Sequence, residues 1–257
     1  MYSIRKLLKL KDYVTLVGTV LGIIALLCAG IGTREYVSLG FFLVSITLGT
    51  DLLDGYLARK MGTVNEMGRE LDSLSDSLTF GITPALLTFQ AFRTGDSYDI
   101  FIIIGSICFA LGAILRLARF NITKSAGYTG LPTPVSALLM IAFFYGNYFY
   151  AFAYGGLYYP FPEFSYYSIP IIMILISWFN ITTYIRFGEK GKRLYLIFII
   201  IAPLCPVFGI IGILNPNFLI SMIISFIFFA SFFGLLIAIV MGFFMKVKSK
   251  TGKSEIS

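Results

Sequence analysis

The sequence predicts an all-α integral membrane protein with about eight transmembrane helices and both termini on the cytoplasmic side. Of its 257 residues, 58% are hydrophobic and 13% are charged, and the mean hydropathy is +0.87, a composition far from that of soluble globular proteins. The apolar residues form runs of about the ~20 residues that a helix needs to cross the hydrocarbon core. The basic residues lie almost entirely on one side of these runs.

The apolar runs predict the helices one by one. The first carries Gly18 and Gly22, small residues four positions apart that allow close helix packing. The last three contain no charged residue, so we expect them to act as scaffold or dimer surface. The aromatic stretch 154–165 is typical of an outer membrane interface. The expected spans are residues 13–31, 37–58, 72–92, 98–120, 133–153, 166–185, 194–214 and 217–245.

The distribution of Lys and Arg predicts the orientation. Of the 20 basic residues, all but Arg34 and Arg93 fall at the same ends of the predicted spans. The positive-inside rule places these ends in the cytoplasm, so we expect a multi-pass protein of the cell membrane. The net charge of +7 is then a topology signal, and we expect no nucleic-acid partner.

Four carboxylates inside or beside the apolar runs mark the candidate site: Asp51, Asp54, Asp72 and Asp76. Their spacings of three and four residues place each pair on one face of its own helix. If the two helices pack side by side, the carboxylates repel one another unless a divalent cation lies among them, and oxygen ligands suit Mg²⁺, Mn²⁺ or Ca²⁺. The chain has no histidine, which excludes imidazole bases and histidine-ligated zinc.

Small and basic residues adjoin the carboxylates. Gly55 and Ala58 follow on the same helix side and form a shallow notch where a flat group can approach the backbone, and Arg59 lies where it can pair with a phosphate. A capping-box pattern at residues 63–66 predicts the start of the third helix, near Asn65 and Gly68. We therefore expect the acidic cluster to be recessed in a cavity open to the cytosol.

A second basic motif ends the fourth predicted span with the letters R-L-A-R-F-N. Arg116 and Arg119 are three residues apart and are expected to share a helix face, with Asn121 just beyond. Arginines at a membrane edge often extend toward the headgroups, which is one interpretation. The other is that they bind an anionic substrate group, because a guanidinium holds a carboxylate through two hydrogen bonds.

The pattern D-x-x-D-G-x-x-A-R, eight residues, then G-x-x-x-D-x-x-x-D resembles the signature of the CDP-alcohol phosphotransferases. Phe80, Gly81, Pro84 and the R-L-A-R-F-N motif resemble the phosphatidylserine synthase branch. The resemblance covers residues 12–140 and implies a six-helix core, to which the later spans are additional. All eight signature positions are matched: Asp51, Asp54, Gly55, Ala58, Arg59, Gly68, Asp72 and Asp76.

The resemblance implies a reaction in which a hydroxyl attacks the lipid-side phosphate of CDP-diacylglycerol or CDP-archaeol and CMP leaves. It implies two divalent cations, Mg²⁺ or Mn²⁺, held by the four aspartates, with Asp76 also the general base for L-serine. It implies a homodimer and a single transferase domain over residues 1–257. The implied CDP-lipid contacts are Thr15, Gly55, Ala58, Arg59, Asn65 and Gly68, and the implied serine contacts are Arg116, Arg119 and Asn121.

Other functions fit parts of the sequence. An inositol or glycerol phosphate acceptor is the first alternative within the family. An intramembrane cation transporter is the second, because paired carboxylates in a membrane also mark ion pathways. A purely structural scaffold accounts for the last three spans but leaves four buried carboxylates unexplained.

Overall fold

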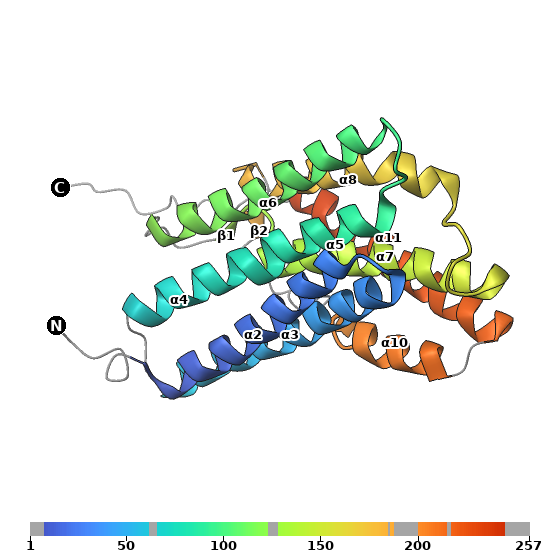
Figure 1. Cartoon of the computed structure of the whole chain (residues 1–257). Helices are drawn as coiled ribbons and strands as arrows, with labels where there is room; N and C mark the ends of the chain where they lie inside the picture. Colours follow the sequence, from blue (N-terminus) through green and yellow to red (C-terminus); the bar gives the residue numbers. More distant parts are fainter. Residues whose placement is uncertain are drawn as a thin grey trace, which may run out of the picture.

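Long helices that run alongside one another make up the described part of the chain in this computed structural model (Figure 1). The structure describes residues 8–61, 66–122, 128–184, 186–187, 200–214 and 217–244. Two residues of β1 (Tyr128–Thr129) pair antiparallel with β2 (Arg186–Phe187). The helices are α2 (Leu10–Ile31), α3 (Arg34–Met61), α4 (Glu66–Asp76), the π-helical turn η1 (Ser77–Ile82), α5 (Thr83–Phe92), α6 (Asp99–Ile122), α7 (Thr133–Gly155), α8 (Glu163–Ile181), α10 (Leu204–Leu214) and α11 (Phe218–Phe244).

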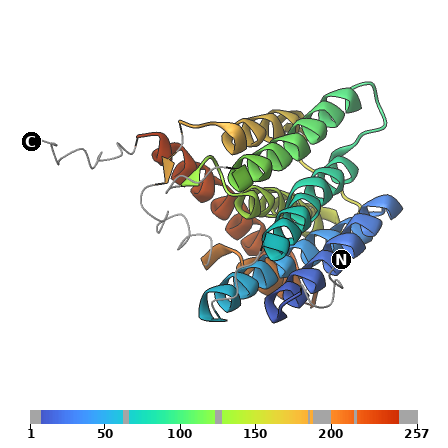
Figure 2. The same ribbon diagram turned by 90° about the vertical axis from the view of Figure 1, so that its left-hand side faces the viewer.

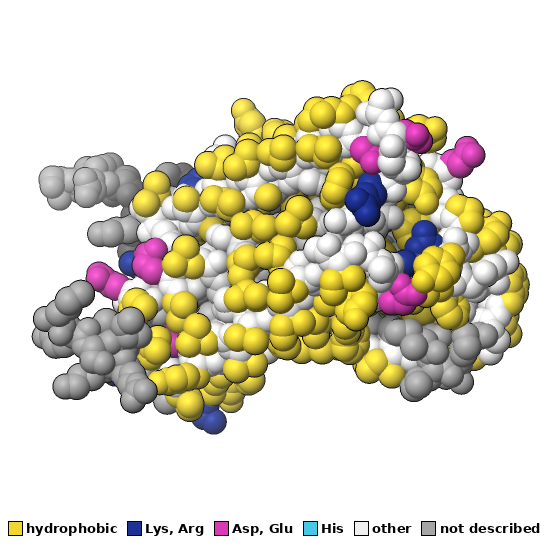
Figure 3. Space-filling model, in the orientation of Figure 1, with side chains coloured by type: hydrophobic (Ala, Val, Ile, Leu, Met, Phe, Trp, Pro, Cys, Tyr) yellow, Lys and Arg dark blue, Asp and Glu magenta, His cyan; other side chains and the backbone are white. Residues whose placement is uncertain are grey.

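Six described helices are long and apolar enough to cross a membrane. The visible face in Figure 3 is mostly hydrophobic through its middle, and charged side chains gather toward its two ends. This pattern confirms a multi-pass membrane protein, because a lipid-facing surface excludes charge. The spans match the first, second, fourth, fifth, sixth and eighth predicted ones: Leu10–Ile31, Arg34–Leu57, Asp99–Ile122, Thr133–Gly155, Glu163–Ile181 and Phe218–Met241.

The third predicted span, 72–92, is not one regular helix. α4, η1 and α5 follow one another as a single rod, in which the backbone N–H of Thr83 donates to the carbonyl of Leu78, five residues earlier (Figure 1). Pro84 has no N–H, and in a regular α-helix its ring would clash with the carbonyl four residues before it. The wider π-helical turn relieves this steric clash. The seventh predicted span lies partly outside the described residues, which resume at residue 200.

Helix α7 occupies the centre of the bundle, with 89% of its most apolar stretch buried. It packs against α11, while α6 packs against α8 and α2 against α3 (Figure 2). The rings of Phe41 and Phe144 stack with centroids 4.3 Å apart and join α3 to α7. The later helices α8 and α11 therefore pack against the earlier ones, and their role as scaffold or dimer surface stays a prediction.

Two glycines let α2 approach its neighbours closely. A Cβ atom added at Gly18 would lie 2.6 Å from the hydroxyl of Thr50 on α3, and one added at Gly22 would collide with Thr79 in η1. The predicted close-packing face is thereby confirmed. Because both contacts lie next to the aspartates, this packing also brings three helical segments together around the site.

The aromatic stretch 154–165 lies at the opposite end of α3 from the aspartates. The guanidinium of Arg34 lies 4.2 Å from the ring centre of Phe161 and donates to the carbonyls of Leu157 and Tyr159 at 2.7 and 2.6 Å. Arg34 precedes Asp51 by roughly 25 Å of helix, at 1.5 Å per residue. The stretch therefore anchors the far end of the bundle and does not contribute to the candidate site.

Candidate functional site

All four predicted aspartates line one cavity between α2, α3 and the α4–η1 segment. Its empty volume, which includes open solvent, is about 210 Å³. The lining residues are Thr15, Gly18, Thr47, Thr50, Asp51, Asp54, Asp72, Ser75, Asp76, Thr79 and Phe80.

Three of the aspartates form the tightest group. Asp51, Asp72 and Asp76 each offer one carboxylate oxygen, and these oxygens all lie within 4.8 Å of one another. The predicted convergence of two helix faces is therefore confirmed. Hard anionic oxygens at this spacing fit a divalent cation such as Mg²⁺ or Mn²⁺, which would remove their mutual repulsion.

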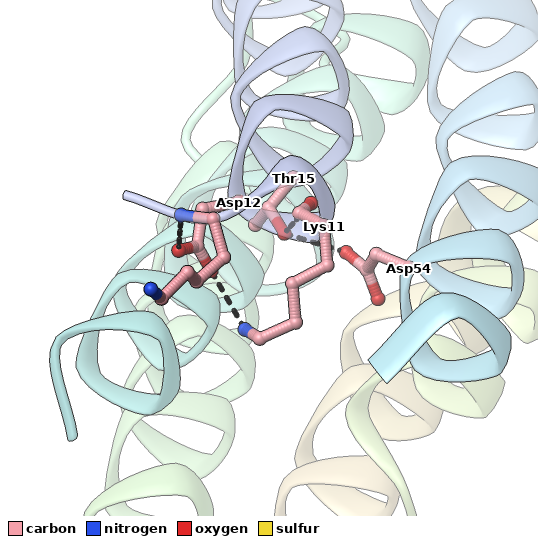
Figure 4. A network of polar contacts seen from close by, with 5 residues as sticks. Lys11, Asp12, Thr15 and Asp54 are labelled. Atoms are coloured by element: carbon pink, nitrogen blue, oxygen red, sulfur yellow. Dashed lines mark hydrogen bonds and ion pairs between the residues drawn. The ribbon is translucent and has the colours of Figure 1, made fainter. Parts of the chain in front are cut away.

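The fourth carboxylate is held by the first helix. The hydroxyl of Thr15 donates to Oδ2 of Asp54 at 2.7 Å, and the Asp54 side chain is buried. Figure 4 shows this bond crossing from α2 to α3. Thr15 was expected to contact the CDP-lipid; the structure gives it the further role of orienting one of the carboxylates.

A set of hydroxyl side chains around the carboxylates was missed by the sequence reasoning. Thr47 and Thr50 line the cavity from α3, and Ser75 and Thr79 line it from α4 and η1. Each lies three or four residues from an aspartate, so helical periodicity was the signal that pointed to them. Ser75 also shares a 2.7 Å hydrogen bond with Thr19 of α2, which ties the two walls together.

Arg116 lies near the carboxylates, as expected. Its side chain is 8% exposed and donates to the hydroxyl of Thr133 at 3.1 Å. It interacts electrostatically with Asp51 and Asp76. The structure therefore brings a buried cation beside the acidic cluster.

Arg119 and Asn121 make other contacts. Arg119 donates to the carbonyls of Ile181 at 2.5 Å and Asn180 at 3.3 Å, at the end of α8. Asn121 accepts a hydrogen bond from Ser73 of α4 at 3.0 Å and donates to Glu70 at 3.3 Å. Although the two arginines are three residues apart on one helix, Arg116 lies beside the aspartates and Arg119 binds the carbonyls that the end of α8 offers. The predicted serine contacts stay predictions.

The structure does not place the remaining predicted CDP-lipid contacts in the cavity. Gly55 and the buried Gly68 belong to α3 and α4, and neither is among the residues that line the cavity. Ala58 and Arg59 belong to α3, but their side chains are outside the described part of the structure, as is Asn65. These assignments stay predictions.

Comparison with known proteins identifies the family. Residues 9–185 match the family model described as CDP-alcohol phosphatidyltransferase. The chain belongs to this family. The predicted family resemblance and the all-α membrane fold are confirmed. The cation-transporter and scaffold alternatives lose their support, since the acidic cluster lies at the signature positions.

Curated relatives extend the comparison. The chain is 41% identical over 143 residues to a CDP-diacylglycerol–serine O-phosphatidyltransferase of Methanocaldococcus jannaschii, covering 56% of this chain and 64% of that protein. It is 42% identical over 98 residues to an archaetidylserine synthase of Methanothermobacter thermautotrophicus, covering 37% and 41%. It is 32% identical over 160 residues to a CDP-diacylglycerol–serine O-phosphatidyltransferase of Saccharomyces cerevisiae, covering 56% of each. The chain thus spans less than two thirds of each of these relatives.

Proposed function

We propose that this protein transfers a phosphatidyl or archaetidyl group from CDP-diacylglycerol or CDP-archaeol to the hydroxyl of L-serine and releases CMP. The observation that carries the proposal is the convergence of Asp51, Asp72 and Asp76 within 4.8 Å in a cavity that Asp54 also lines. The relatives named CDP-diacylglycerol–serine O-phosphatidyltransferase and archaetidylserine synthase support serine as the acceptor.

The four aspartates would hold two divalent cations, Mg²⁺ or Mn²⁺, with Ca²⁺ able to occupy the same ligands. Such cations supply charge neutralisation at the diphosphate and make CMP a better leaving group. The hydrogen bond from Thr15 fixes the orientation of Asp54, as partners of metal-ligating carboxylates commonly do. Gly18 has no side chain, so α2 can approach Thr50 of α3 closely at this wall of the cavity.

Asp76 is the proposed general base. Asp76 is the last residue of α4, and the π-helical turn begins at the next residue. Its carboxylate faces the same cavity as those of Asp51 and Asp72 and can accept the proton of a serine hydroxyl that attacks the phosphate. With no histidine in the chain, a carboxylate is the natural choice for this role.

Arg116 is the proposed contact of the serine carboxylate. The residue is buried beside the pair Asp51 and Asp76, so an amino acid bound to its guanidinium has its hydroxyl directed toward the base. Arg119 holds the end of α8 and Asn121 joins α6 to α4. In this proposal they position α6, which carries Arg116.

Arg116→Lys is expected to raise the KM for serine by about tenfold or more, because Lys cannot make the two parallel hydrogen bonds of a guanidinium. The KM for CDP-lipid should change little. Arg119→Lys is the matched variant and should raise the serine KM less, since its recorded partners are backbone carbonyls. Initial rates with varied serine measure both values, and equal effects of the two substitutions would contradict the separate roles.

The setting of the reaction is also proposed. The positive-inside pattern supports a cell-membrane protein with both termini and the active site on the cytoplasmic side. We also propose that residues 1–257 form one transferase domain and that the protein is a homodimer. Membrane lipids would surround it, and no nucleic-acid partner is expected.

The deciding experiment supplies purified protein with Mn²⁺ or Mg²⁺, radiolabelled L-serine and either CDP-diacylglycerol or CDP-archaeol. We expect labelled phospholipid and an equal amount of CMP with at least one CDP-lipid. Parallel reactions with labelled inositol or glycerol phosphate test the other acceptors of the family. Product from one of these and none from serine would overturn the proposed acceptor.

A further inference from the structure

A buried ion pair lies at the beginning of α2, one helical turn from Thr15. The Lys11 ammonium lies 2.7 Å from Oδ1 of Asp12, and the two residues are 8% and 0% exposed. Oδ2 of Asp12 accepts the backbone N–H of Lys9 at 2.7 Å. Figure 4 shows the Lys11 side chain between Asp12 and Asp54, with its ammonium turned toward Asp12.

This pair is not explained by stability alone. Burying an ammonium and a carboxylate costs desolvation energy that their attraction often fails to exceed. An ammonium has three N–H donors, and within the described residues one of them has a recorded acceptor, Asp12. Lys11 is therefore held in place by its neighbour and keeps donors for a further anionic group.

Lys11 and Arg116 approach the acidic cluster from different helices. Lys11 lies on α2, one turn before Thr15, whose hydroxyl donates to Asp54. Arg116 lies on α6 and donates to Thr133 at the beginning of α7. The two cations come from helices far apart in the sequence, α2 and α6. The cluster thus has a cation on each of two sides.

Phosphoryl transfer places the attacking and leaving oxygens roughly in line on opposite sides of the phosphorus. In the proposed function, the attacking hydroxyl lies on the side of Asp76 and Arg116. The oxygen that leaves with CMP then lies on the other side, toward Asp54 and Lys11. A cation there offsets the negative charge that develops on the departing phosphate.

We propose that Lys11, held by Asp12, binds the phosphate of the departing CMP. The inference rests on the proposed function and adds to it a residue outside the signature. In the reaction the serine oxygen forms a bond to the lipid-side phosphorus, the bond from that phosphorus to the bridging oxygen breaks, and CMP leaves with the bonding electron pair. Asp76 takes the hydroxyl proton, and Lys11 stabilises the CMP phosphate without transferring a proton.

The test measures CMP affinity of the detergent-purified protein by calorimetry in the presence of Mg²⁺. Lys11→Met should weaken CMP binding by about tenfold or more, because a charge-assisted hydrogen bond to phosphate is lost. Lys11→Arg should restore part of the affinity. Lys9→Met is the matched control: it removes one positive charge two residues away, keeps the backbone N–H that Asp12 accepts, and should bind CMP as the wild type does.

A second variant guards against misfolding. Lys11→Met alone leaves Asp12 buried without its cation, whereas the double variant Lys11→Met, Asp12→Asn removes both charges together. The double variant should fold with near wild-type thermal stability, bind CMP as weakly as Lys11→Met, and keep a serine KM close to that of the wild type. This split between CMP affinity and serine KM would not arise from a merely structural pair.

Wild-type CMP affinity in both Lys11→Met and the double variant Lys11→Met, Asp12→Asn would overturn the inference. So would variants whose only defect is weaker binding to vesicles containing anionic lipid, because the anion at Lys11 would then be a membrane phosphate. The proposed function fails separately, if the wild type makes no phospholipid from serine. Weakened CMP binding in Lys11→Met would still place Lys11 at the nucleotide phosphate in that case.

Discussion

Asp72→Asn is expected to lower the rate of serine transfer by at least about a thousandfold, which corresponds to the several kcal/mol that a bound metal contributes to charge stabilisation. Asp72 belongs to the group of three carboxylates within 4.8 Å, and an amide in its place removes one negative charge at the same volume. The protein should still insert and keep its helices. Labelled-serine incorporation measures the rate, and divalent-dependent thermal protection by CMP measures the loss of the metal site.

The matched control is Asp96→Asn, which makes the same chemical change on an exposed residue in the loop between α5 and α6. It should retain wild-type activity. Near wild-type turnover of a well-folded Asp72→Asn protein would contradict the metal-site proposal.

Asp76→Asn is expected to lower kcat by about 10²–10⁴-fold, the range for loss of a general base, while CMP affinity falls less than in Asp72→Asn. The reason is that a base acts in the chemical step, whereas a ligand also acts in ground-state binding. Single-turnover rates with saturating CDP-lipid, together with calorimetric CMP affinities, separate the two effects. An equal loss of affinity in both variants would make Asp76 mainly a ligand.

The acidic site was predictable from the sequence because its signal is local. Helical spacing places Asp51 and Asp54 on one face of their helix and Asp72 and Asp76 on one face of the next. Because a charge in an apolar run is energetically costly, its presence predicts a functional site. That the two faces meet follows from the short connection between the helices. Hydropathy likewise predicted six of the spans, since length and composition alone define them.

Other features depend on tertiary neighbours and were not predictable. Arg116 and Arg119 have the same local signal, yet one lies beside the aspartates and the other binds carbonyls at the end of α8. The position of the Arg119 side chain depends on the carbonyl acceptors at the end of α8. The spacing of residues within α6 cannot predict these acceptors. The pairing of Lys11 with Asp12 is local in sequence, but its burial against the acidic cluster required the packing of α2 on α3.

The π-helical turn after Asp76 sets the rotational phase of the rod that contains it. One extra residue in a turn rotates everything beyond it by about 100° relative to an uninterrupted α-helix. The half with the aspartates can therefore face the cavity while the half with Leu87 and Phe92 turns its apolar side to the core. Deleting one residue from Ser77–Ile82 would remove this offset, so it would misdirect the carboxylates even if every side chain of the cluster were retained.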